Sequence, residues 1–198
     1  MPVRARLTMM LAATLVLVAA LAVVMLAGSN DRSAGQGFEG SRPPATVPPM
    51  DFALKDETGH VTRLADYRGR PVILTFMYST CRDTCPLTAQ QIKIALDDLG
   101  HDVPALAVSV DPVNDTPLNA KRFLLKQGVL GRMHFLLGDR AQLARIWNAY
   151  GIKPQGKDFD HSAYVMLIDG RGRWQVSWPV QELRPEGLAH DLRLLGAA

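Results

Sequence analysis

Short apolar runs recur along the chain from about residue 50 onward, each with the length of a single buried strand. Several are rich in β-branched or aromatic residues, which suit the pleated surface of a sheet. The predicted strands are Pro71–Tyr78, Pro104–Val110, His134–Leu137, Ala163–Ile168 and, after a turn, Arg173–Trp178. Ahead of them, the runs Phe52–Leu54 and Val61–Leu64 flank Thr58-Gly59 and predict a small hairpin.

Amphipathic patterns with the period of an α-helix lie between these strands. Leu143, Ile146 and Tyr150 fall on one helical face, behind a capping pair formed by Asp139 and Gln142. Further helices are expected around Ile92–Leu99, from Thr116-Pro117 to Gln127, and after Pro185. Strands that alternate with helices, and then end in a hairpin and a last helix, predict an α/β fold with a mixed sheet and helices on both faces.

The first 28 residues have a different pattern. Leu7–Ala27 is a run of 21 residues without a charged side chain, which as a helix would span the roughly 30 Å hydrocarbon core of a membrane. It predicts a single N-terminal transmembrane helix. Arg4 and Arg6 precede the run, so the positive-inside rule places the N-terminus in the cytoplasm and the remaining chain on the exported side. A cleaved signal peptide, with Ala20–Ala22 as its small-residue site, is the alternative.

The sequence therefore divides into a membrane anchor (1–28), a flexible tether (29–49) rich in glycine, serine and proline, and a globular domain (50–198). The formal charge is +3, from 22 basic and 19 acidic residues, and Arg4 and Arg6 supply most of this excess. Without them the chain lacks the basic surplus of nucleic-acid-binding domains, so we expect no nucleic acid as a partner.

The chain has only 2 cysteines, which excludes a scaffold of several disulfides, a four-thiolate zinc site and a cysteine-ligated iron–sulfur cluster. Both lie in one window, Cys81 to Cys85, between a predicted strand and a predicted helix that Pro86 helps to begin. This is the placement of a thioredoxin-like active site, with one residue more than Cys-x-x-Cys. The helix N-terminus predicts a stabilised thiolate at Cys85. A structural disulfide is the alternative, although so small a loop removes little chain entropy.

Two soft sulfur ligands suit Cu(I), and a third ligand should then come from elsewhere in the chain. Of the 5 histidines, His161 stands at the mouth of a predicted apolar strand, where the sites of α/β proteins gather. His134 begins a strand and could be packed, whereas we expect solvation for the other three, His60 in the hairpin turn, His101 in a polar loop and His190 in the last helix. Asp111 and Asp115 flank prolines and are expected to serve turns or caps.

Three ordered motifs then make a family resemblance specific. They are Cys81-x-x-x-Cys85-Pro86, Val110-Asp111-Pro112-x-x-Asp115-Thr116-Pro117, and Asp160-His161-Ser162 before an apolar strand. Over about residues 50–196 the chain resembles the Sco/SenC family of membrane-anchored, thioredoxin-fold copper proteins that help to assemble cytochrome c oxidase. One departure is Arg82-Asp83-Thr84 between the cysteines, where the family often has Pro-Asp-Val.

The resemblance implies a thioredoxin-like domain in which Cys81, Cys85 and His161 hold copper, as Cu(I) and as Cu(II). The implied function is a copper metallochaperone, rather than an enzyme, for the copper A site of cytochrome c oxidase subunit II. Other exported copper or thiol-redox proteins are further expected partners. The implied location is the inner membrane, with the domain in the periplasm.

A different class of function stays open from the same residues. Cys81 and Cys85 could instead form a redox-active pair, making the protein a membrane-anchored thiol–disulfide oxidoreductase that reduces cysteines of the oxidase or of another exported protein. A peroxiredoxin-type peroxidase and a purely structural docking domain are less favoured alternatives.

Overall fold

The computed structural model describes residues 37–43, 50–154 and 164–196. By its internal contacts the chain divides after Gly37, and the described fold is that of the second unit, Phe38–Ala198. The predicted anchor, most of the predicted tether and His161 lie outside the described residues. Among the residues that are described, no helix has the length and apolar character needed to cross a membrane.

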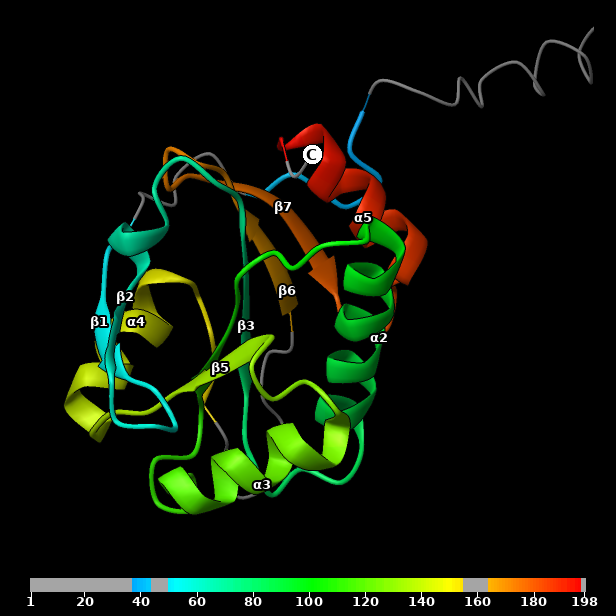
Figure 1. Ribbon diagram of the computed structural model, residues 1–198. Helices are drawn as coiled ribbons and strands as arrows, with labels where there is room; N and C mark the ends of the chain where they lie inside the picture. The colour runs from blue at the N-terminus through cyan, green and yellow to red at the C-terminus, as the bar shows by residue number, and fades with distance from the viewer. Residues whose placement is uncertain (1–36, 44–49, 155–163, 197–198) are drawn as a thin grey trace, which may run out of the picture. The chain divides into compact units, whose positions relative to one another are not determined.

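A five-stranded sheet forms the centre of the domain, with strand order β5-β4-β3-β6-β7 (Figure 1). β3, β4 and β5 are parallel, whereas β6 runs antiparallel to β3 and β7 antiparallel to β6. The sheet is therefore mixed, as the sequence predicts. Its strands are β3 (Val72–Met77), β4 (Ala105–Ser109), β5 (Met133–Leu136), β6 (Tyr164–Ile168) and β7 (Trp174–Pro179).

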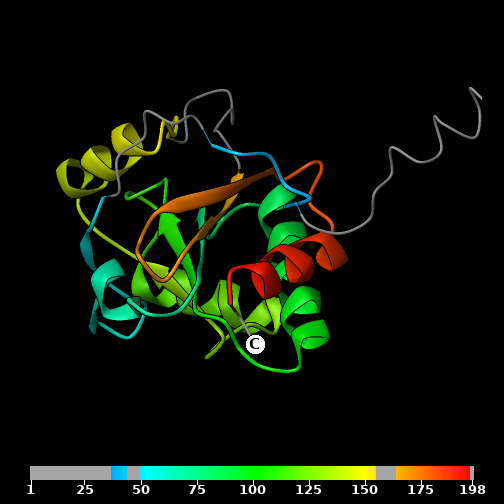
Figure 2. The ribbon, with the colours of Figure 1, turned by 90° about the horizontal axis from the view of Figure 1, so that it is seen from above.

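Helices cover both faces of this sheet. Two crossovers, β3-α2-β4 and β4-α3-β5, step in the same direction and place α2 and α3 on one face, where α5 packs against α2. α4 lies on the opposite face, which Figure 2 shows from above. The helices are α2 (Thr84–Leu99), α3 (Pro117–Gln127), α4 (Arg140–Ala149) and α5 (Pro185–Leu194).

The core explains why continuous apolar runs predicted these strands. All six residues of β3 and all five of β4 are buried, because each strand has neighbours in the sheet and helices over its faces. The observed strand bounds differ from the predicted ones by at most one residue at either end. The helix predicted to begin near Cys85-Pro86 and to include Ile92–Leu99 starts at Thr84, and a short 3-10 helix, η1 (Leu64–Tyr67), was not expected.

The predicted hairpin is present as β1 (Ala53–Lys55) and β2 (Val61–Arg63), paired antiparallel around the turn that contains Gly59. It lies alongside β5, because the Lys55 carbonyl accepts a hydrogen bond from the Leu137 N–H at 2.7 Å. The hairpin therefore lies beside the carboxyl end of β5, where the parallel strands β3, β4 and β5 finish.

The segment from Glu39 to Ser41 is fixed to the other end of the domain. Asp191 on α5 is fully buried and accepts hydrogen bonds from the Glu39 N–H (2.7 Å), the Gly40 N–H (2.9 Å) and the Trp178 indole (3.0 Å). Gly40 lies so near Trp178 that a Cβ atom would overlap its ring. The buried Asp191 carboxylate, with its three hydrogen-bond donors, thus holds residues 39–41 against β7 and α5.

Candidate metal and thiol site

The two cysteines lie together at the carboxyl end of β3. Cys81 belongs to the loop that follows this strand, and Cys85 is in the first turn of α2. The Cys85 N–H points at the Cys81 sulfur, 3.4 Å away, so a backbone donor of the helix N-terminus serves Cys81. Both side chains are buried and neither is in a disulfide. The structure thus brings together the cysteine pair that the sequence singled out.

The two thiols have opposite acidities. The hydrogen bond from the Cys85 thiol, with help from the backbone of Asp83 and Cys85, lowers the pKa of Cys81 to about 4 despite its burial. The same bond, together with burial, raises the pKa of Cys85. The thiolate is therefore on Cys81, whereas the sequence placed it on Cys85. The difference arises mainly because the Cys85 thiol donates its hydrogen to the Cys81 sulfur, and the Cys85 N–H at the helix N-terminus, aimed at the same sulfur, adds to the effect.

Tyr78 is a member of the site that the sequence did not reveal. It follows β3 directly, as the last residue of the predicted apolar run, and no sequence motif marks it as a site residue. Its hydroxyl hydrogen-bonds Cys81, and burial followed by this bond raises the pKa of Tyr78. Because a neutral phenol donates a proton to a thiolate, Tyr78 adds a third kind of donor around the Cys81 sulfur.

Asp115 holds the loop that carries Cys81 in place through hydrogen bonds to Ser79. It is buried, and its Oδ1 accepts hydrogen bonds from the Ser79 N–H and hydroxyl, both at 2.6 Å. Its Oδ2 accepts from the Ser109 hydroxyl at 2.6 Å, so the ends of β3 and β4 are joined through one side chain. Burial, only partly offset by these bonds, raises the pKa of Asp115.

The structure confirms the expected turn role of Asp111. Asp115 does more than was expected, because its carboxylate joins the ends of β3 and β4. Asp111 accepts a hydrogen bond from the Asn114 side chain at 2.7 Å within the turn. The cap of α3 is instead Thr116, whose hydroxyl accepts from the Asn119 N–H. Because Thr116 caps α3, the Asp115 side chain is not needed as a cap and is buried against the thiol loop instead.

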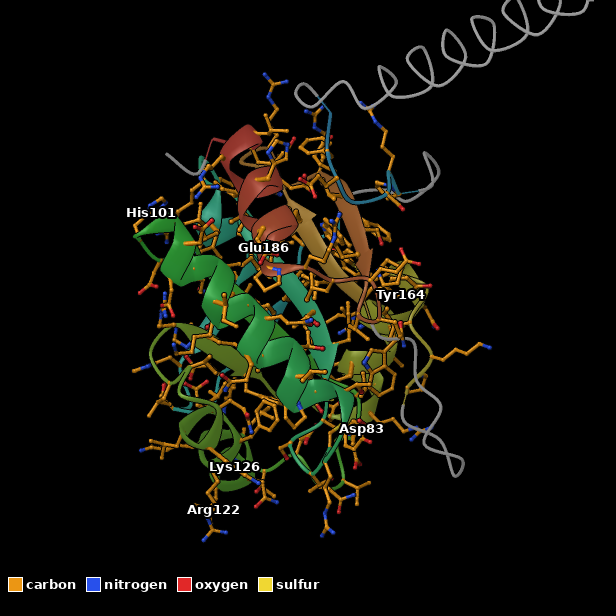
Figure 3. All side chains as sticks on the ribbon, turned by 90° about the vertical axis from the view of Figure 1, so that its right-hand side faces the viewer. Asp83, His101, Arg122, Lys126, Tyr164 and Glu186 are labelled. Carbon is orange, nitrogen blue, oxygen red and sulfur yellow. The ribbon has the colours of Figure 1, made fainter. Side chains whose placement is uncertain are left out.

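A pocket of about 170 Å³ opens beside Cys81. It lies between the thiol loop and α3, and Figure 3 shows Asp83 at the start of α2 at the same end of the molecule as Arg122 and Lys126 of α3. Its lining residues are Ser79, Thr80, Cys81, Asn119, Arg122, Phe123, Lys126 and Gln127. Two cations at the pocket favour anionic groups approaching the thiolate.

The third predicted ligand, His161, lies outside the described residues. Tyr164, the first described residue after it, begins β6 and stands beside β3, where its carbonyl accepts a hydrogen bond from the Thr75 hydroxyl at 3.0 Å. The assignment of His161 as a ligand therefore stays a prediction. Arg82, between the cysteines, is exposed.

Comparison with known proteins agrees with this architecture. The family model SCO1/SenC matches residues 42–195. This chain belongs to the SCO1/SenC family. A relative, the mitochondrial protein SCO2 homolog of Bos taurus, is 30% identical over 141 residues, which is 65% of this chain and 52% of that protein. The chain thus spans between about half and two thirds of the length of the first curated SCO1/SenC relatives.

Two solved structures of the SCO1/SenC family are similar. The structure of Bradyrhizobium japonicum ScoI with copper bound is 30% identical, has a TM-score of 0.63, and covers 73% of this chain and 97% of that one. The structure of BsSco, described as a member of the Sco family of cytochrome c oxidase assembly proteins with a disulfide switch, is 21% identical with a TM-score of 0.66. It covers 78% of this chain and 96% of that one, and it supports the thioredoxin-like Sco fold.

Proposed function

We propose that this SCO1/SenC protein is a copper metallochaperone that supplies the copper A site of cytochrome c oxidase subunit II. The observation that carries the proposal is the hydrogen-bonded pair Cys81 and Cys85, one of them a thiolate, at the start of α2. Membership of the family and the copper-bound state of the ScoI relative support copper as the cargo.

The donor chemistry fits this cargo. Two sulfur ligands are soft and suit Cu(I), and the thiolate of Cys81 can meet the ion first. Cys85 would then release its proton as it binds, since a metal ion competes with the proton for the sulfur. His161 would complete the set, as an imidazole ligand accepted by both Cu(I) and Cu(II).

Copper titration of the full-length protein tests this ligand set. Cu(I) affinity is measured by competition with a chromophoric chelator, and Cu(II) binding by the sulfur-to-copper charge-transfer band. We expect Cys81→Ser and Cys85→Ser to lower the affinity by about 100-fold or more, and His161→Ala by at least about tenfold. His101→Ala, which changes an exposed histidine in the loop after α2, is the matched control. Equal affinity in His161→Ala and in the control would exclude His161 as a ligand.

A thiol–disulfide oxidoreductase is the second candidate, and the opposite acidities of the two thiols favour it. The Cys81 thiolate would attack one sulfur of a client disulfide, forming a mixed disulfide and releasing one client thiolate. Cys85 would then lose its proton and attack the Cys81 sulfur, forming the Cys81–Cys85 disulfide and releasing the second client thiolate. Two electrons pass to the client, and the protein is left oxidised.

These two functions make different demands on His161. The oxidoreductase needs both cysteines and no metal. Reduction of a disulfide-bonded peptide with the sequence of a copper A loop should therefore proceed unchanged in His161→Ala with a chelator present. If the reductase activity is lost when a chelator removes the metal, and the protein binds copper when no chelator is present, the oxidoreductase is excluded and the chaperone remains as the proposed function.

For location, we propose that residues 1–28 anchor the protein in the inner membrane and that the domain faces the periplasm. The uncharged run Leu7–Ala27 and the preceding Arg4 and Arg6 support this orientation. A reporter enzyme active only after export, fused behind residue 198, should be active. Fusion after Arg6 should leave the reporter inactive.

A further inference from the structure

A second group of ligand atoms lies on the opposite side of β5 from β4, where the β1–β2 hairpin meets the sheet edge. Asp56 Oδ2 lies 3.7 Å and Glu57 Oε1 lies 3.6 Å from His134 Nδ1. One ligand atom from each of the three residues lies within 4.8 Å of the other two. None of these residues lines the pocket beside Cys81 or belongs to the thiol loop.

The fold holds both carboxylates in place through their other oxygens. Asp56 Oδ1 accepts hydrogen bonds from the Thr58 N–H (2.8 Å) and the His60 N–H (3.0 Å) inside the hairpin turn. Glu57 Oε2 accepts from the Phe135 N–H of β5 at 2.9 Å. Each carboxylate is thus anchored on one side and turns its second oxygen toward the imidazole, which is how pre-organised ligands are presented.

The cluster is under-satisfied by protein groups alone. The side chains of Asp56 and Glu57 are only 5% and 2% exposed, and two buried carboxylates this close repel each other. His134 Nδ1 is itself buried and has no hydrogen-bond partner, since both oxygens lie beyond hydrogen-bond distance. A buried ring nitrogen without a hydrogen-bond partner and two converging carboxylates make a polar site that an ion could complete.

We propose that Asp56 Oδ2, Glu57 Oε1 and His134 Nδ1 form a binding site for a divalent transition-metal ion of the zinc type, separate from the thiol pair. An ion at ordinary Zn–N and Zn–O distances holds tetrahedral ligand atoms about 3.3 Å apart, so the two separations between the imidazole nitrogen and the carboxylate oxygens need to contract by only a few tenths of an ångström. The two carboxylate oxygens lie within 4.8 Å of each other. Two carboxylates and a neutral imidazole also balance the charge of such an ion. The imidazole side chain is 37% exposed, although its Nδ1 is buried.

The ion would join two parts of the fold that are distant in sequence. Asp56 and Glu57 stand on the hairpin turn, whereas His134 stands on β5, 77 residues after Glu57. Binding to the folded state alone would therefore stabilise the attachment of the hairpin to the sheet. A proton on His134 Nδ1 would compete with the ion for this nitrogen. The two carboxylates favour that proton, because Glu57 first and Asp56 more weakly raise the pKa of His134.

Zinc binding in a protein without the thiol ligands tests the proposal independently of the proposed function. Full-length protein carrying Cys81→Ser, Cys85→Ser and His161→Ala is titrated with Zn²⁺ against a chromophoric chelator. We expect one zinc ion per chain, and a loss of affinity of at least about tenfold when His134→Ala or Glu57→Gln is added. Glu57→Gln keeps an oxygen that can accept from the Phe135 N–H, so the hairpin contact is preserved.

His101→Ala in the same background is the control, and its zinc affinity should not change. Zinc should also raise the melting temperature of the background protein and leave that of its His134→Ala form unchanged, which separates lost ligation from lost folding. Absence of zinc binding, or affinity that survives both His134→Ala and Glu57→Gln, would overturn the site. Neither result bears on copper binding by the thiols, which these variants lack.

Discussion

Asp115 accepts both the backbone N–H and the hydroxyl hydrogen of Ser79, each at 2.6 Å, across 36 positions of sequence. Ser79 lies two residues before Cys81, and the other oxygen of Asp115 accepts from Ser109, the last residue of β4, so Asp115 fixes the start of the thiol loop to the end of β4. The thiolate therefore depends on a buried carboxylate that is not one of its own neighbours in the chain. A buried, fully used acceptor of this kind is costly to remove.

Asp115→Ala should lower the free energy of unfolding by about 2 kcal/mol, because the Ser79 N–H and the Ser109 hydroxyl lose their acceptor in the interior. Urea denaturation measures this loss. Asp111→Ala, in the same loop, removes an exposed turn contact and should cost less than half as much. Equal costs for the two variants would show that Asp115 has no special role.

The pH dependence of Asp115 follows from burial, which raises its pKa in the folded state. A raised folded pKa adds stability at low pH, and this stability is lost as the pH rises through the folded pKa. Compared with Asp115→Asn, which does not titrate, the natural protein should therefore gain free energy of unfolding as the pH falls from 7 toward 4. Urea melts of the two proteins at several pH values check the sign of this difference.

Cys81 should react as a thiolate far below the usual range. With its pKa near 4, the rate of alkylation by iodoacetamide should stay nearly constant from pH 8 to pH 5 and fall to half near pH 4. Cys85→Ala removes the largest contribution to this pKa and should move the midpoint upward. Cys85→Ser keeps a hydroxyl donor and should move it less, and identical profiles in the two variants would contradict the role of the Cys85 hydrogen bond.

Arg122 and Lys126 should steer anionic reagents to the thiolate through the pocket they line. Replacing both by glutamine should slow the reaction of Cys81 with an anionic aromatic disulfide by about three- to tenfold at low salt. The reaction with a neutral disulfide should change little. Lys121→Gln, on an exposed position of the same helix outside the pocket, is the control. A loss that persists at 1 M salt would point to a structural effect instead.

Asp191 should govern how firmly residues 39–41 are attached. Asp191→Ala leaves the Trp178 indole and two backbone N–H groups without an acceptor, so we expect a loss of about 2–4 kcal/mol and faster proteolysis near Gly40. Limited proteolysis with mapping of the cut site measures the second effect. Glu182→Ala, an exposed acidic residue before α5, should change neither quantity.

The strands and helices could be predicted because their residues carry local signals. Apolar runs such as Val72–Met77 are buried on both faces, and the capping pair Asp139 and Gln142 marks the start of α4 just as expected. The strand order could not be predicted in the same way. Nothing local in the sequence says that β6 pairs with β3, because that pairing joins residues about 90 positions apart.

The same distinction separates the site residues. Cys81 and Cys85 are neighbours in the sequence, so their pairing needed only a strand, a turn and a helix. Asp115 and the Glu57–His134 contact depend on long-range packing, and only the folded chain brings those groups together. Which thiol is ionised also depends on geometry, since the Cys81 sulfur is the one that accepts hydrogen bonds from both the Cys85 thiol and the Cys85 N–H.

The pairings at Ser41 and Lys55 have a consequence for how the domain meets other chains. Ser41 exchanges two backbone hydrogen bonds with Ser177 on the edge strand β7, and the Lys55 carbonyl takes the Leu137 N–H beyond the opposite edge strand, β5. Open strand edges invite other strands, and at these positions the chain has already filled the vacancy itself. A chain shortened past Ser41 would lose the pairing with Ser177 and should expose this part of β7 to strand addition and aggregation.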